Sequence, residues 1–112
     1  MHELGISRSI VAIVVKAARG RRVRRVTLEI GKLAGVEGGA IAFCFEAAAQ
    51  GTVLEGAVLS IREISGRARC RACATEFVVD TLFTACACGS RDSMRLSGDE
   101  LNVKSIEIEE AA

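Results

Sequence analysis

The sequence of 112 residues contains no proline, tryptophan or tyrosine, and its four phenylalanines are its only aromatic residues. Any hydrophobic core must therefore be built mainly from valine, isoleucine, leucine and alanine. The absence of proline excludes a proline-stiffened linker between two large domains. The length is that of one domain, or of one domain with a small appendage.

An excess of charge of one sign and long apolar runs are also missing. The formal net charge is +1 at pH 7, which argues against a dedicated nucleic-acid-binding protein. The longest apolar run, residues 10–15, is far shorter than the roughly 20 residues that cross a bilayer. The start of the chain, with His2 and Glu3, does not resemble a secretory signal. We therefore expect a soluble protein of the cytoplasm with no membrane partner.

Hydrophobic periodicity predicts a fold of the α+β class. Apolar residues recur with helical spacing in two segments, 4–18 and 39–50. They alternate with polar residues, as in strands with one buried face, in three segments, 23–30, 57–64 and 101–109. This order predicts two helices on a small, roughly three-stranded sheet.

The last strand and the cysteine-rich segment before it refine this prediction. Apolar residues change phase between Val103 and Ile106, which predicts a β-bulge near Lys104. The cysteine-rich segment predicts an inserted zinc-ribbon-like lobe, with a short β-rich stretch over residues 75–79. We therefore divide the chain into an α/β domain of residues 1–66 plus 92–112 and a zinc-binding lobe of residues 67–91.

Four of the five cysteines form two closely spaced pairs, Cys70 with Cys73 and Cys86 with Cys88. Two such pairs converge in structural zinc sites with four sulfur ligands. No histidine lies in this segment, so the zinc would be structural, and neighbouring arginines would offset the net negative charge of four thiolates. A dithiol redox switch is an alternative. The fifth cysteine, Cys44, is expected to be a small buried hydrophobic residue.

The start of the chain carries a second candidate metal site. The amine of Met1, the imidazole of His2 and the amide nitrogens of His2 and Glu3 are able to surround a metal ion in one plane. Planar nitrogen coordination suits Ni²⁺ or Cu²⁺. Both the amine and the imidazole bind metal only when unprotonated, so we expect release of the metal as the pH falls. An ordinary solvated chain terminus is the alternative.

Several short motifs together resemble the HypA family of nickel metallochaperones, which mature [NiFe]-hydrogenases and, in some organisms, urease. The similarity covers nearly the whole chain. The matching motifs, in chain order, are Met1-His2-Glu3-Leu4, Ile30-Gly31, Phe43-Cys44-Phe45-Glu46, Gly51-Thr52, the Cys-x-x-Cys pair and Cys88-Gly89-Ser90.

The resemblance implies nickel on Met1, His2 and Glu3, and structural zinc on the four clustered cysteines. Glu37 matches an acidic position that assists nickel or partner contact, although a charge at a helix N-terminus is the simpler interpretation. The second cysteine pair departs from the Cys-Pro-x-Cys common in the family, because Ala85 stands where a cysteine aligns.

The resemblance also implies protein partners, namely a HypB-type nickel GTPase and the hydrogenase large-subunit precursor. Self-association into a homodimer is a further expectation. No nucleophile–base pair or phosphate loop is recognisable, so we do not expect an enzyme. A zinc-ribbon module that binds nucleic acid or protein remains the main alternative, and the arginine-rich segment 19–25 is either a solvated surface or a contact for an acidic partner.

Overall fold

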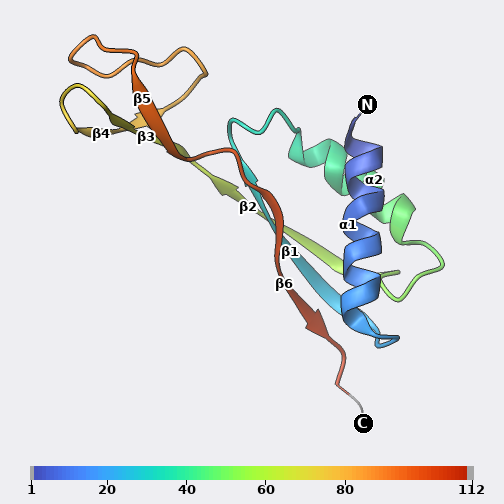
Figure 1. Cartoon of the computed structure of the whole chain (residues 1–112). Helices are drawn as coiled ribbons and strands as arrows, with labels where there is room; N and C mark the ends of the chain where they lie inside the picture. Colours follow the sequence, from blue (N-terminus) through green and yellow to red (C-terminus); the bar gives the residue numbers. More distant parts are fainter. Residues whose placement is uncertain (1, 111–112) are drawn as a thin grey trace.

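The computed structural model describes residues 2–110, which form two lobes joined by a narrow neck (Figure 1). The larger lobe, called the body below, contains both helices and a sheet of strand order β2-β1-β6. The smaller lobe contains a sheet of strand order β4-β3-β5. The elements are α1 (His2–Ala18), β1 (Val23–Gly31), α2 (Gly38–Ala49), β2 (Val58–Ile64), β3 (Gly66–Cys70), β4 (Glu76–Val79), β5 (Ser93–Ser97) and β6 (Leu101–Ile108).

The body confirms the α+β prediction of two helices on a three-stranded sheet. Helix α1 turns one apolar side inward, and Ile10, Val14 and Ala18 on that side are all buried. The chain then reverses sharply, because Arg19 and Gly20 both adopt positive φ angles, 52° and 82°. No helix within residues 2–110 is long and apolar enough to cross a membrane.

Strand β1 is the central strand of the body. Val26, Leu28 and Ile30 alternate along it and are buried against the helices. Both helices lie on one side of the sheet, so its other face meets solvent (Figure 1). Glu29 on that outer face accepts a hydrogen bond from the side chain of Asn102 and pairs with Lys104 of β6.

The predicted β-bulge is confirmed. Thr27 faces Ser105 and Leu28 faces Val103, so Lys104 has no partner in the ladder between β1 and β6. The extra residue changes which face the following side chains point to. As a result, Val103 and Ile106 both pack against the core in spite of their odd spacing.

The smaller lobe contains two strands that the sequence did not reveal, β3 and β5. β3 pairs antiparallel with both β4 and β5, and its burial alternates strictly between the apolar or small residues and the arginines. Because β5 is Ser93–Ser97, the second sheet reaches beyond the predicted lobe of residues 67–91. The division of the chain into two domains remains a prediction.

The neck between the lobes depends on three glycines that lie close together, Gly31, Gly66 and Gly98. A Cβ atom on Gly31 would lie 1.9 Å from the carbonyl oxygen of Gly98, and Gly98 has a φ of +115°. The side chain of Leu33 packs against both Gly66 and Gly98. The backbone N–H groups of Gly31 and Leu33 donate to Glu100 and Gly98, at 2.8 and 2.9 Å. The backbones therefore pack directly against each other where the two sheets meet.

We predict that Gly31→Ala destabilises the protein by about 2 kcal/mol or more, because a methyl group here must displace backbone atoms rather than a flexible side chain. Urea denaturation measures the effect. Gly5→Ala is the matched control, since a Cβ at Gly5 in α1 meets no atom within 4 Å and alanine favours helix by about 0.5–1 kcal/mol. Equal stability of the two variants would contradict the proposed tight contact.

Candidate metal centres

The four clustered cysteines converge at the far end of the smaller lobe. Their sulfur atoms all lie within 4.8 Å of one another. The Sγ atoms of Cys70 and Cys88 are 3.6 Å apart, as are those of Cys73 and Cys86. A disulfide requires about 2.05 Å, whereas sulfur atoms bound tetrahedrally to zinc at about 2.3 Å are separated by about 3.8 Å. The cluster therefore has the dimensions of a four-sulfur zinc site.

Tight backbone turns bring the two cysteine pairs together. At the first pair, the N–H of Ala74 donates to the carbonyl oxygen of Cys70 at 2.9 Å, and Ala74 has a positive φ of 65°. At the second pair, the N–H of Gly89 donates to Cys86 at 2.8 Å, and Gly89 has a φ of 91°. Gly89 thus supplies the conformation needed to close a turn with only one residue between cysteines. The shifted Cys86 lies within the cluster in spite of the departure at Ala85.

The metal-free thiols differ in acidity because their surroundings differ. The hydroxyl and backbone N–H of Thr75, followed by the Cys86 thiol, lower the pKa of Cys73 to about 6. At Cys86 the backbone N–H of Cys88 favours the thiolate, but burial and the neighbouring cysteines outweigh it and raise the pKa to about 12. A metal ion must therefore displace at least one proton at neutral pH, so metal affinity rises with pH.

The arginines near the cluster and the fifth cysteine, Cys44 in α2, both differ from the expectations. The side chains of Arg67 and Arg69 both pair with Glu76, and Arg71 pairs with Asp92. Arg67 and Arg69 thus share one carboxylate and Arg71 faces another, so carboxylates as well as thiolates compete for these arginines. Cys44, expected to be buried, is only half-buried, because it lies at the edge of the inward-facing side of α2.

The second candidate site lies at the start of α1, outside the smaller lobe. His2 is the first described residue of the helix, and its side chain is exposed, whereas Glu3 is half-buried. One turn later, the buried hydroxyl of Ser7 donates to the carbonyl oxygen of Ile41 in α2, at 3.2 Å. This contact fixes the beginning of α1 on the body. Met1 lies outside the described residues, so the position of its amine is not part of the structure.

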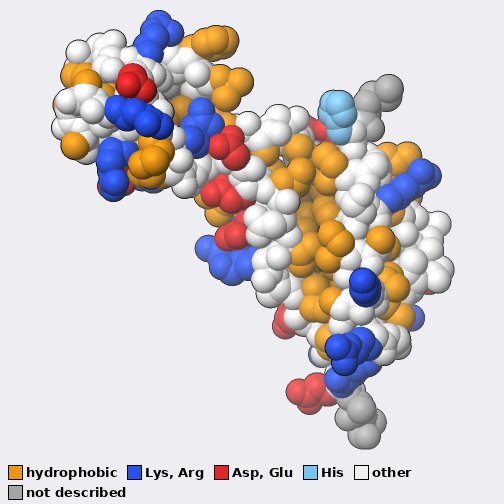
Figure 2. All heavy atoms as spheres, in the orientation of Figure 1, with side chains coloured by type: hydrophobic (Ala, Val, Ile, Leu, Met, Phe, Trp, Pro, Cys, Tyr) orange, Lys and Arg blue, Asp and Glu red, His pale blue; other side chains and the backbone are white. Residues whose placement is uncertain are grey.

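The position of this segment at the start of a helix affects the hydrogen bonding of its amide nitrogens. The first N–H groups of an α-helix have no carbonyl partner within the helix. His2 and Glu3 both lie in the first described turn of α1, the part of a helix to which this rule applies. An apolar groove of about 460 Å³ begins at His2 and continues past Ile6 and Ile13 to Leu101 of β6. Figure 2 shows the histidine at one end of an apolar stripe between α1 and β6.

Glu37 lies at the N-terminus of α2 and serves as its N-cap. Its carboxylate accepts hydrogen bonds from the backbone N–H groups of Gly39 and Ala40, at 2.9 and 2.7 Å. This geometry confirms the simpler interpretation of a helix N-terminal charge. Both carboxylate oxygens are thereby engaged, which leaves Glu37 a structural role in this conformation.

Taken together, the fold and the sites define a two-lobed metal-binding protein, with a four-cysteine cluster in one lobe and an exposed histidine at the start of the other. The sequence matches the family model described as "Hydrogenase/urease nickel incorporation, metallochaperone, hypA" over residues 1–108. The chain belongs to the HypA family.

Individual relatives and solved structures agree with this assignment. The sequence is 54% identical over 110 residues to the hydrogenase maturation factor HypA of Trichormus variabilis, covering 98% of this chain and 97% of the relative. It is 51% identical to that of Geobacter metallireducens, covering 97% of this chain and all of the relative. The solution structure of the Ni metallochaperone HypA from Helicobacter pylori matches with a TM-score of 0.70 at 23% identity, covering 96% of this chain and 97% of the other. At that identity the structural match supports the fold alone.

We predict that Ala74→Gly stabilises the smaller lobe by about 1 kcal/mol, because glycine adopts a positive φ without the steric cost that alanine bears there. Thermal unfolding of the metal-loaded protein measures the gain in stability. A second measurement is the rate at which a chelator removes the metal, which should fall. Ala72→Gly is the control, since Ala72 lies in the same turn without a positive φ and should be neutral or destabilising. A loss of stability in Ala74→Gly would show that the turn differs from the one described.

Proposed function

We propose that this protein binds Ni²⁺ at its N-terminus and delivers it for the maturation of [NiFe]-hydrogenase. Membership of the HypA family is the observation that carries the proposal. The proposed role is that of a metallochaperone and not that of an enzyme. The protein would pass its nickel on and keep its zinc. The alternative of a nucleic-acid-binding zinc ribbon is not favoured, and three arginines of the smaller lobe are paired with carboxylates. Urease maturation is a second client process in the description of the family.

The proposed nickel ligands are the amine of Met1, the imidazole and amide nitrogen of His2, and the amide nitrogen of Glu3. His2 is exposed at the beginning of a helix that a hydrogen bond from Ser7, in its second turn, holds on the body. An exposed site built from few side chains allows the metal to pass to an acceptor by ligand exchange. Planar nitrogen coordination favours Ni²⁺ over Zn²⁺, because Zn²⁺ prefers tetrahedral coordination.

The proposed zinc ligands are Cys70, Cys73, Cys86 and Cys88, and the zinc would be structural. Their sulfur atoms are spaced as tetrahedral coordination requires. Four protein ligands leave no open position for a substrate. Such a site would operate in the cytoplasm, where thiols remain reduced.

A protein of hydrogenase maturation works with other components of that machinery. We propose a HypB-type nickel GTPase as the source or acceptor of the metal and the hydrogenase large-subunit precursor as the client. The apolar groove beside His2 supports contact with a partner at the nickel site, because an exchange of ligands requires the two proteins to touch there. A homodimer remains part of the proposal.

We predict that His2→Ala lowers nickel affinity by about 100-fold or more, beyond the loss expected for residues outside the inner coordination sphere. Calorimetric titration with Ni²⁺ measures the affinity, and metal analysis shows whether zinc is retained. Arg8→Ala, an exposed change one to two turns further along α1, is the control and should bind nickel as the unchanged protein does. Unaltered nickel affinity in His2→Ala would refute the assigned site.

We predict that Cys73→Ser releases zinc and unfolds the smaller lobe while the body remains folded, since the body has its own hydrophobic core. Metal analysis and NMR spectra of the backbone amides would show both effects. Cys44→Ser, outside the cluster, should retain zinc fully. A Cys73→Ser protein that keeps stoichiometric zinc would contradict the four-cysteine ligand set.

A further inference from the structure

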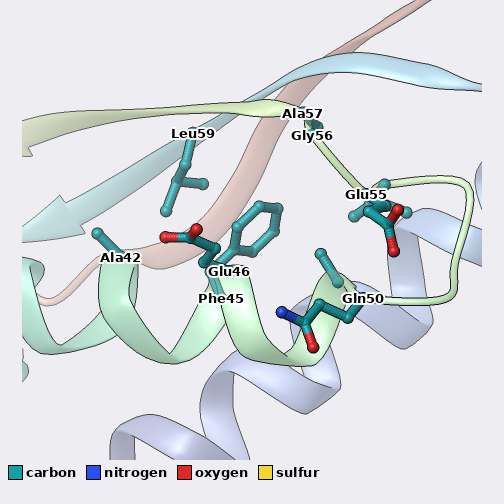
Figure 3. A pocket seen from close by; sticks show the side chains of 10 residues that line it. Ala42, Phe45, Glu46, Gln50, Glu55, Gly56, Ala57 and Leu59 are labelled. Atoms are coloured by element: carbon teal, nitrogen blue, oxygen red, sulfur yellow. The ribbon is translucent and has the colours of Figure 1, made fainter.

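A cavity of about 560 Å³ lies between α2, the segment that follows it and β2 (Figure 3). It shares no lining residue with the cysteine cluster or with the groove at His2. Its inner wall is apolar and rigid, because Phe45, Ala49 and Leu54 are at most 3% exposed. Its rim is polar and carries the carboxylates of Glu46 and Glu55 and the amide of Gln50. Figure 3 shows the two carboxylates on opposite sides of the Phe45 ring.

Glu46 is an unfavourable residue for its position. It lies in the last turn of α2, which contains no basic residue. The carbonyl groups at the end of a helix carry partial negative charge, so a carboxylate there typically costs about 0.3–1 kcal/mol. A residue that breaks such a local rule without a compensating contact is a candidate for a functional role.

This negative charge has no ion-pair partner within the described residues. Among residues 2–110, no lysine or arginine forms an ion pair with the carboxylate of Glu46 or Glu55. Arg22 reaches Glu55 but donates to its backbone carbonyl oxygen, at 2.8 Å. One carboxylate oxygen of Glu55 accepts the N–H of Gly51 at 2.8 Å, which orients the group and leaves its other oxygen available.

The donor set fits an organic cation better than a metal ion. The cavity offers only two carboxylates, and within the described part of the chain the cysteines form the only group of three or more metal-ligating side chains. A cation with an apolar stem would use both features of the cavity. Its stem would lie on Ala42, Ala57 and Leu59, which also line the cavity, and its charged end would lie between the carboxylates.

We propose that this cavity binds an arginine side chain of a protein partner. The planar guanidinium donates in several directions at once, which suits two carboxylates on either side of a ring. It also gives up its hydration more readily than an ammonium ion does, which suits an apolar inner wall. A side chain presented by a docked partner meets the cavity at a high effective concentration, so a single weak contact suffices to orient the complex. The proposal does not depend on the nickel site.

The experiment uses two tripeptides that differ only in charge, acetyl-Leu-Arg-Leu-amide and the same peptide with citrulline, the neutral isostere of arginine. Each is titrated into the full-length zinc-loaded protein, and NMR shifts of the backbone amides locate the binding. We expect the arginine peptide to shift signals from residues 45–59 and to bind about tenfold more tightly than the citrulline peptide. Equal affinity of the two peptides, or an absence of shifts in this segment, would overturn the proposal.

Glu46→Gln separates binding from folding. We expect it to weaken the arginine peptide about tenfold without lowering the melting temperature, because it removes an unfavourable charge from the end of α2. Glu63→Gln, an exposed residue of β2 outside the cavity, makes the same change in net charge and should leave binding unaltered. Equal effects of the two variants would mean that only net charge matters, and would reject the site.

Agmatine, which carries the guanidinium group without a peptide, distinguishes a partner's side chain from a free small cation. We expect it to bind more weakly than the arginine peptide, because it lacks the flanking leucines that would rest on apolar lining residues such as Ala42 and Leu59. Agmatine binding as tight as that of the peptide would instead assign the cavity to a small metabolite and overturn the partner-docking proposal.

Discussion

The burial of β1 beneath the two helices is the interaction on which both lobes depend. Its inward-facing residues hold α1 in place, and α1 in turn presents His2 at the surface. The same strand pairs with β2 and β6, and each of these is followed or preceded within a few residues by a strand of the smaller lobe. At the end of β1, Gly31 packs against Gly98 in the neck. One buried strand therefore positions His2 and the base of the cysteine lobe.

The smaller lobe has little stability of its own. Its buried hydrophobic residues are only four, Ala68, Cys70, Val79 and Cys86, and two of these are proposed metal ligands. Backbone pairing without a core does not offset the entropy lost on folding. Bound zinc would supply the missing free energy, as it does in small zinc-dependent domains. The body, by contrast, has a continuous core drawn from α1, β1 and α2, so its fold does not depend on a bound metal.

Sequence periodicity was sufficient to predict the helices and strands of the body, but it did not predict all the strands of the smaller lobe. The phase change around Lys104 predicted the bulge because one buried face constrains the register of β6. β3 and β5 were missed because each is only five residues long and carries arginine, so small buried residues such as Ala68 gave no clear alternation. The spacing of cysteines predicted which thiols belong together, but only the structure showed that Cys86 converges with the rest. The cavity at Glu46 was invisible in the sequence, because its two carboxylates lie nine positions apart, one in α2 and the other in the irregular segment that follows, which periodicity does not describe.

The central claim is that an unblocked chain start, with the imidazole beside it, holds nickel in a plane of nitrogen ligands. The most direct measurement is a Ni²⁺ titration of the protein that begins at Met1, followed by optical absorption spectroscopy and compared with the same protein carrying one extra residue ahead of Met1. The added residue converts the amine into an amide and leaves every side chain in place. The account predicts one tightly bound planar Ni²⁺ in the first protein and weak, octahedral binding in the second. Identical affinity and spectra for the two proteins would contradict it.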